Sequence, residues 1–192
     1  MNINKAIRKQ HKSYIRFMLS MCFIFIALPY ILYISGKYMK PFFIVYLFLI
    51  ECLVLTGIIL KSDANILRFQ DYKYKIKVAY GVLRRKIVIF CDKIVFVHAE
   101  GKNDNIEIVI VSDFKFRNQN LHNMDNSFFR KYPEVSNYWE RIRKSHPDKK
   151  FYYTAIKNGG YYKYVFLDTL YRTCVHAFFS DSSIDRIKEY RN

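Results

Sequence analysis

The stretch FFIVYLFLIECLVLTGIIL, residues 42–60, decides the architecture of this chain. It is nineteen residues long, apolar almost throughout, and carries one carboxylate, Glu51, at its middle. A helix needs about 20 mostly apolar residues to cross a hydrocarbon core of ~30 Å. A helix buried in a soluble domain rarely stays apolar on every face. The stretch is therefore predicted to be a transmembrane helix.

A second run of the same length, FMLSMCFIFIALPYILYIS at residues 17–35, contains no charged residue. Only GKYMKP, residues 36–41, separates the two runs, so they are predicted to form an antiparallel hairpin. The first run exceeds the apolar part of a signal peptide and lacks a small-residue cleavage pattern, so we expect it to be retained. Pro29 is expected to kink it, because neighbouring helices can satisfy the freed carbonyl.

The distribution of charge predicts the orientation of the hairpin. The segment 1–16 contains no acidic residue, and its basic residues are Lys5, Arg8, Lys9, Lys12 and Arg16. The hairpin loop has only Lys37 and Lys40, so the positive-inside rule places the N-terminus in the cytoplasm. We therefore expect a multi-pass protein of the cell inner membrane with both termini cytoplasmic.

The remaining chain, residues 66–192, is long enough for one folded domain. Its 127 residues can bury a single core, and its 24 basic and 14 acidic residues give a net charge of +10. Two cysteines, Cys22 and Cys52, lie in the predicted spans, and Cys91 and Cys174 lie in the domain. Because cytoplasm is reducing, all four are predicted to be packing residues without a disulfide framework.

Short strands dominate the first half of the domain. Val, Ile, Tyr and Phe are abundant and turn residues interrupt them, which predicts strands near 69–79, 82–90, 93–98 and 106–111. The alternation in YKYKIKV predicts that Tyr72, Tyr74, Ile76 and Val78 face the core. Lys73, Lys75 and Lys77 then face solvent or the membrane surface.

Helices are predicted in the second half. PEVSNYWERIRKSHP, residues 133–147, has apolar residues at helical spacing and a proline suited to the first turn. Asn158, Gly159 and Gly160 predict a tight turn between two strands, at 151–157 and 161–167. Apolar spacing over 170–178 and a restart after Asp181 or Ser182 indicate further helix. The predicted fold class is a membrane α-helical hairpin followed by a mostly antiparallel β domain with one or two helices (α+β).

The stretch YKYKIKVAYGVLRRKIVIFCDKIVFV, residues 72–97, resembles the core of bacterial pleckstrin-homology-like domains. The residues that carry the resemblance are Tyr74, Ile76, Gly81, Val82, Leu83, Arg84, Arg85, Ile89, Asp92, Lys93, Ile94 and Val97. The similarity extends over residues 68–111, and such domains often follow a pair of transmembrane helices. It implies a PH-like domain over 66–192, with an insertion at 112–150 and a helix from about 168 that plugs the barrel.

Two features are candidate sites. A carboxylate at the bilayer centre costs several kcal/mol, so Glu51 is a functional candidate. It either contacts another helix, in a homo-oligomer or a membrane-protein partner, or is neutral and bonded to Tyr30, Ser20 or a backbone carbonyl. The second candidate is a basic surface for anionic lipid or a protein partner, formed by Lys73, Lys75, Lys77, Arg84, Arg85, Lys86 and Lys93. Its alternative is a solvated strand face.

No catalytic or metal-binding pattern stands out. Cys174 and His176 point to different faces of a helix, the histidines His98, His122 and His146 lack partners at metal spacing, and the Gly-Gly pair lacks the lysine of a phosphate loop. No cofactor, metal or nucleic-acid partner is expected. The predicted function is a membrane-anchored binding or scaffold protein, not an enzyme. The alternatives are a small membrane enzyme and an accessory or immunity subunit of a membrane complex.

Overall fold

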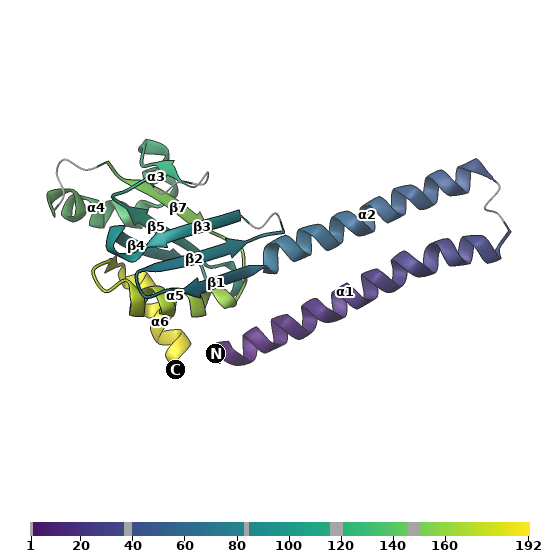
Figure 1. Ribbon diagram of the computed structural model, residues 1–192, viewed down its shortest axis with the longest axis horizontal. Helices are drawn as coiled ribbons and strands as arrows, with labels where there is room; N and C mark the ends of the chain where they lie inside the picture. Colours follow the sequence, from purple (N-terminus) through teal and green to yellow (C-terminus); the bar gives the residue numbers. More distant parts are fainter. Residues whose placement is uncertain (1, 37–39, 83–84, 116–120, 146–149) are drawn as a thin grey trace.

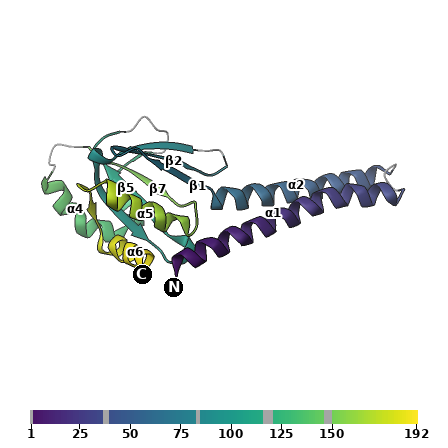
Figure 2. The same cartoon turned by 60° about the horizontal axis from the view of Figure 1, so that its bottom comes forward.

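The computed structural model describes residues 2–36, 40–82, 85–115, 121–145 and 150–192. Two long helices, α1 (Ile3–Ile34) and α2 (Pro41–Asn65), form a hairpin that projects from an α+β domain (Figures 1 and 2). The two apolar stretches are long enough to cross a membrane and stand clear of the domain, which suggests membrane insertion. The predicted hairpin is confirmed, but α1 begins at Ile3, so the basic residues from Lys5 to Arg16 are helical too.

The described residues of the domain form two sheets and four α-helices, more helices than predicted. Sheet A is antiparallel, with the order β1-β2-β3, and sheet B has the order β6-β7-β5-β4-β8 with only β8 parallel to its neighbour. The strands are β1 (Leu67–Asp71), β2 (Lys75–Tyr80), β3 (Arg85–Phe90), β4 (Ile94–Glu100), β5 (Glu107–Ser112), β6 (His122–Asn123), β7 (Tyr152–Ile156) and β8 (Phe178–Phe179). The helices are α3 (Asn126–Lys131), α4 (Pro133–Ser145), α5 (Tyr162–Thr173) and α6 (Asp181–Arg191), with short 3-10 turns at Cys91–Lys93 and Asn103–Asn105. The fold class, a hairpin and a mostly antiparallel domain, is confirmed.

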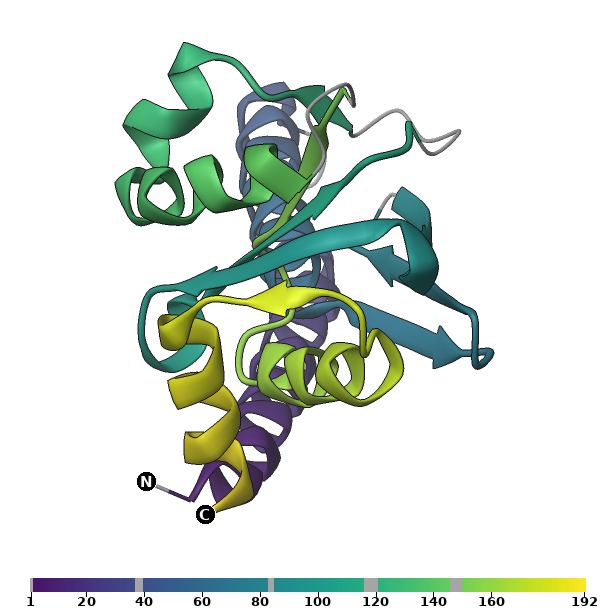
Figure 3. The same ribbon diagram turned by 90° about the vertical axis from the view of Figure 1, so that its left-hand side faces the viewer.

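Sheet B is covered on both faces. Ile108 and Ile110 of β5 join one core cluster with sheet A, α5 and α6, whereas Val109 and Val111 join a second cluster with α3 and α4. Figure 3 shows α5 and α6 on one side of this sheet and α3 and α4 on the other. Two-sided burial explains why β5 reads as a continuous apolar run. Helices α3 and α4, which lie in the expected insertion at 112–150, thus supply one of the layers that bury sheet B.

The alternating stretch YKYKIKV is partly a turn. Ile76 and Val78 are buried and Lys77 is exposed, as predicted. Tyr72 and Tyr74 instead lie in the β1–β2 turn and are exposed. Lys73 has φ of 61° there, and its backbone N–H donates to Asp71 Oδ1 at 3.0 Å, so a side-chain-supported turn interrupts the predicted long strand.

The predicted hairpin around Gly159 and Gly160 is wrong. Both glycines have positive φ, as expected, but they lead into α5 and not into a strand. Tyr162, Tyr164 and Phe166 alternate, yet Tyr164, Leu167 and Leu170 also have helical spacing and are buried in the core. A short apolar run fits either period, and packing against sheet A decides in favour of the helix.

Cys91 and Cys174 form a disulfide, so the prediction that all four cysteines are unbonded is wrong. The turn after β3 and the C-cap of α5 bring their Cα atoms to 4.6 Å, and both residues are buried. Their 83-residue separation hides this proximity in the sequence. Cys22 and Cys52 are free and exposed on the hairpin.

We expect Cys174→Ser to lower the unfolding free energy of the oxidised protein by about 2–4 kcal/mol, because a cross-link over so long a loop restricts the unfolded chain. Denaturant unfolding of the full-length protein in detergent, monitored by near-UV circular dichroism, measures the change. The same comparison under strong reductant is the control, and the gap between wild type and variant should shrink there. An equal gap in both conditions would assign the loss to packing at residue 174.

Candidate functional site

The outer face of sheet A carries the basic surface. On this face the cross-strand register aligns Arg68, Ala79 and Lys86 in one row and Gln70, Lys77 and Val88 in the next. Because neighbouring strands are about 4.8 Å apart, Arg68 and Lys86 flank the small Ala79 across ~10 Å. No two of these basic residues are directly opposite each other, so the arrangement avoids like-charge pairs.

A groove of about 720 Å³ runs along this face. Its basic lining residues are Arg68, Lys77 and Lys86, and its apolar ones include Ala79, Val82 and Val88. No aspartate or glutamate is among the described lining residues. Lys77 also lies over the ring of Tyr72, with Nζ 4.8 Å from the centroid. The groove therefore combines an apolar floor with positive charge and fits an extended ligand that carries carboxylates.

The predicted basic residues divide between the two ends of the domain. Lys77 and Lys86 line the groove, and Lys75 lies on the same outer face, opposite Phe90. Lys73 and Lys93 lie at turns at the far ends of the strands, away from the hairpin (Figure 1). Arg84 and the side chain of Arg85 fall outside the described part of the structure. Arg68, which the sequence reading missed, lies in the first strand, and only the register places it beside Ala79 and Lys86.

This face does not lie flat on a membrane crossed by the hairpin. One residue, Ile66, separates the end of α2 from the start of β1, and β1 continues away from the hairpin (Figure 1). With the hairpin across a bilayer, the strands of sheet A would run away from it, and the groove, which begins near Ser62 at the end of α2, follows these strands. This orientation presents the face to the aqueous phase and not to the leaflet.

Glu51 lies on the side of α2 that faces α1. It is half-buried together with Leu47, Ile50 and Val54, the pattern of one helix face. Among the described residues it makes no hydrogen bond or ion pair, and so none to Tyr30 or Ser20. The pairs Gln10–Asn65 and Tyr14–Ser62 set the register of the hairpin. Extending it places Glu51 level with about Phe25.

Phe25 is four residues before Pro29. Proline has no N–H, so the carbonyl of Phe25 lacks its usual helical donor. By register, this carbonyl is a candidate for the expected contact of Glu51 with a backbone carbonyl, a hydrogen bond that the described residues do not form.

We expect chemical crosslinking of the membrane-embedded protein, followed by mass spectrometry, to give the same partners for wild type, Glu51→Gln and Glu51→Ala. If the carboxyl group donates to the Phe25 carbonyl in the membrane, the amide of glutamine can replace it and alanine cannot, so thermal stability in detergent should fall with alanine and be retained with glutamine. Loss of a dimer or partner with both variants would instead make Glu51 a recognition element.

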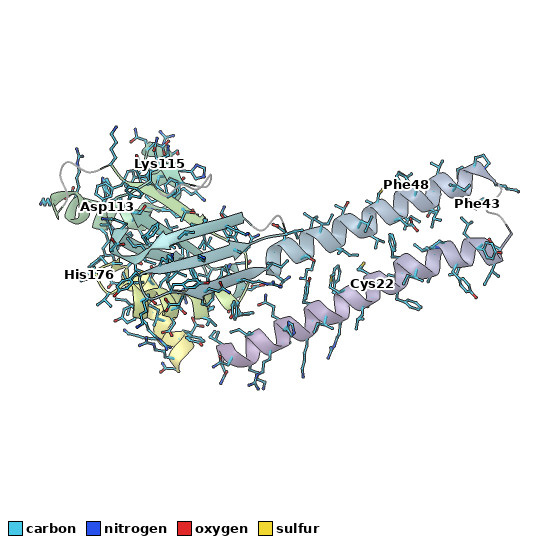
Figure 4. The ribbon with its side chains drawn as sticks, viewed as in Figure 1. Cys22, Phe43, Phe48, Asp113, Lys115 and His176 are labelled. Carbon is cyan, nitrogen blue, oxygen red and sulfur yellow. A yellow bond between two sulfur atoms is a disulfide. The ribbon has the colours of Figure 1, made fainter. Side chains whose placement is uncertain are left out.

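The histidines are dispersed. His98 is fully buried in β4, where its Nδ1 lies 3.0 Å from Ser180 Oγ, and burial lowers its pKa while the charge of Glu134 opposes that shift. His122 is exposed on β6, and Figure 4 shows His176 at the end of the domain away from the hairpin. His146 lies outside the described residues. His98 ties β4 to the serine that caps α6, which is a structural role.

Comparison with known proteins gives no relative. No family model, no curated protein and no solved structure matches the chain. Within the part of the chain that the structure describes, no three histidine, cysteine or acidic side chains form a group that could hold a metal ion. The site is thus defined by geometry and charge alone.

Proposed function

We propose that this protein is a membrane-anchored binding protein whose outer sheet A groove holds an acidic segment of a partner protein. The observation that carries the proposal is the groove itself, whose described lining places Arg68, Lys77 and Lys86 around an apolar floor and includes no aspartate or glutamate. Charge complementarity selects an acidic partner, and alternate apolar side chains can pack on Ala79 and Val88. The outward direction of the strands supports a protein over the leaflet as the ligand of this face.

We also propose that the domain is PH-like. The three-stranded meander that begins at β1, a second sheet packed against it and a helix, α5, in the core between them support this resemblance. Helices α3 and α4 are an addition to the minimal domain, because they cover the second face of sheet B. This identity rests on the sequence resemblance and the layer arrangement together.

Reversing charge in the groove tests the binding role. A fluorescent peptide of alternating glutamate and valine should bind the full-length protein in detergent, measured by anisotropy. We expect Arg68→Glu or Lys77→Glu to weaken binding about tenfold or more, since each variant replaces an attraction with a repulsion. Added salt should weaken the wild-type complex as well.

Lys144→Glu is the matched control, because it makes the same charge change on exposed α4, away from the groove. It should leave peptide affinity within about twofold. Equal losses in all three variants would mean that net charge alone attracts the peptide, and the groove would not be the site.

We propose that both termini are cytoplasmic, as the basic segment before α1 favours. Both ends of the chain lie at the end of the hairpin that carries the domain (Figure 1). A disulfide is typical of oxidising compartments, so Cys91 and Cys174 report on the side that the domain occupies.

Rapid acid trapping of cells, followed by thiol alkylation and mass spectrometry, should find Cys91 and Cys174 reduced if the domain is cytoplasmic. The free cysteines Cys22 and Cys52 are the internal reference for complete alkylation. A fully formed disulfide in trapped cells would place the domain on the opposite side of the membrane.

A further inference from the structure

A second basic cavity, separate from the groove, lies where the hairpin meets the domain. Its volume is about 670 Å³, and its walls come from four segments far apart in the sequence. These are the first turns of α1, the last turn of α2, the turn at Asn103–Asn105 and the loop before α5. Figures 1 and 2 show the start of α1 beside the domain at this junction.

Specific contacts fix the walls. Gln10 Nε2 donates to Asn65 Oδ1 at 2.6 Å, and Gln10 Oε1 accepts from the backbone N–H of Tyr161 at 2.8 Å. Ile3 is 2 % exposed and belongs to the main core cluster, so the first turn of α1 is anchored to the domain. The cavity is therefore part of the folded structure, held by one glutamine that bridges α1, α2 and the loop before α5.

The lining is strongly basic. Lys5 and Lys9 are one turn apart on the same face of α1, and Lys61 faces them from α2. None of these three ammonium groups has an ion pair with another described residue. Lys157 also lines the cavity but lies 3.7 Å from Glu107, and Asp104 is the one acidic residue in the described lining. The lining therefore has an excess of positive charge.

A buried lysine lies behind the same wall. Lys163 is 1 % exposed, and its Nζ donates to the carbonyl of Lys157 at 2.7 Å. Burial lowers its pKa to about 8, with Asp104 and Glu107 opposing the shift, so it is still mostly protonated at neutral pH. Its charge adds to the positive potential of the wall.

The hairpin sets the height of the cavity against a bilayer. Lys61 directly follows the apolar stretch of α2, and Tyr14 lies just before the apolar stretch of α1. The Tyr14 hydroxyl and Ser62 Oγ are 3.1 Å apart and close the membrane end of the junction. A headgroup layer is about 5–8 Å thick, so this end of the cavity lies within it. Lys5 lies ~16 Å further along α1 from Arg16, in water.

From this cavity, its unpaired lysines and its height, we propose that the junction is a binding site for the phosphate of an anionic phospholipid headgroup. The headgroup enters from the leaflet beside Tyr14, and its phosphate lies between Lys9 and Lys61. Part of the headgroup beyond the phosphate extends toward Lys5. Ser13 and the amides of Asn65 and Asn158 supply neutral polar groups in the lining. The site is distinct from the sheet A groove and does not depend on the groove's ligand.

Native mass spectrometry of the full-length protein in neutral detergent tests the site. The protein is titrated with phosphatidylglycerol, with phosphatidylcholine and with inorganic phosphate. We expect Lys9→Gln/Lys61→Gln to weaken phosphatidylglycerol binding about 10- to 30-fold, because each charge near the headgroup contributes about a factor of 5. Lys9→Arg/Lys61→Arg should retain it.

The control variant Lys12→Gln/Lys144→Gln has the same net charge. Lys12 is exposed near the membrane end of α1 and Lys144 is exposed on α4, and neither lines the cavity. It should bind phosphatidylglycerol within about twofold of wild type. Equal weakening in both double variants would show diffuse surface attraction and overturn the site.

Two further readouts are needed. The first distinguishes a lipid phosphate from inorganic phosphate, and the second distinguishes the cavity proposal from the groove proposal. Inorganic phosphate that binds as tightly as phosphatidylglycerol, without preference over phosphatidylcholine, would make this a soluble-phosphate site and overturn the lipid assignment. Binding of the acidic peptide should be unchanged in Lys9→Gln/Lys61→Gln, which also shows that the variant is folded. Loss of peptide binding in Lys9→Gln/Lys61→Gln would mean that this variant has disrupted the junction. The test then depends on Lys9→Arg/Lys61→Arg. Loss of lipid binding in the arginine variant as well would overturn the proposal.

Discussion

The direct connection between α2 and β1 is the constraint on which the rest of the structure depends. The last carbonyls of a helix have no partner within it. Here the domain supplies donors: Asn158 Nδ2 to Asp63 O at 2.8 Å, and the N–H of Gly159 to Ala64 O, also at 2.8 Å. A Cβ atom on Gly159 would approach Leu67 Cβ to 2.5 Å, so only glycine permits this contact. The hairpin is thus continuous with the domain and not joined to it by a linker.

That connection explains why α1 extends so far beyond its apolar stretch. With α2 fixed to sheet A, an antiparallel α1 must pass the domain as it leaves the membrane region. Ile3 and Ile7 pack against the core, and Gln10 bonds to both α2 and the loop before α5. The basic segment that sets the predicted orientation is therefore also a structural part of the domain. Two contacts, one from each helix, restrict how the domain can tilt relative to the hairpin.

The features that depend on local pattern could be predicted from the sequence, and those that depend on long-range packing could not. The length and apolar composition of residues 42–60 predict a helix that can cross a membrane. The alternation of Ile76, Lys77 and Val78 predicts a strand with one buried face. Residues 161–167 fit two periods, and only the core decides between them. The Cys91–Cys174 disulfide and the contact of Gln10 with Tyr161 join residues 83 and 151 positions apart. No local sequence pattern predicts contacts between residues so far apart.

The same distinction applies to the candidate sites. The run of basic residues from Lys73 to Lys93 is evident in the sequence. It includes residues at the turns away from the hairpin as well as residues on the outer face of sheet A. Arg68 was overlooked because one basic residue in a strand carries no signal until the register places it across Ala79 from Lys86. The junction cavity could not be predicted from the sequence, because its lysines come from both helices and from the loop before α5.

Distance from the membrane decides which anions each basic surface can meet. Surface potentials fall off within about 8–10 Å in physiological salt. The groove extends along the strands away from the hairpin, so the acidic protein segment that we propose as its ligand would approach from the aqueous phase. The cavity begins at Lys61, at the end of the apolar stretch, where headgroup phosphates are concentrated. Because the α2–β1 connection holds the groove and the cavity at different heights, the two sites that we propose would meet different anions.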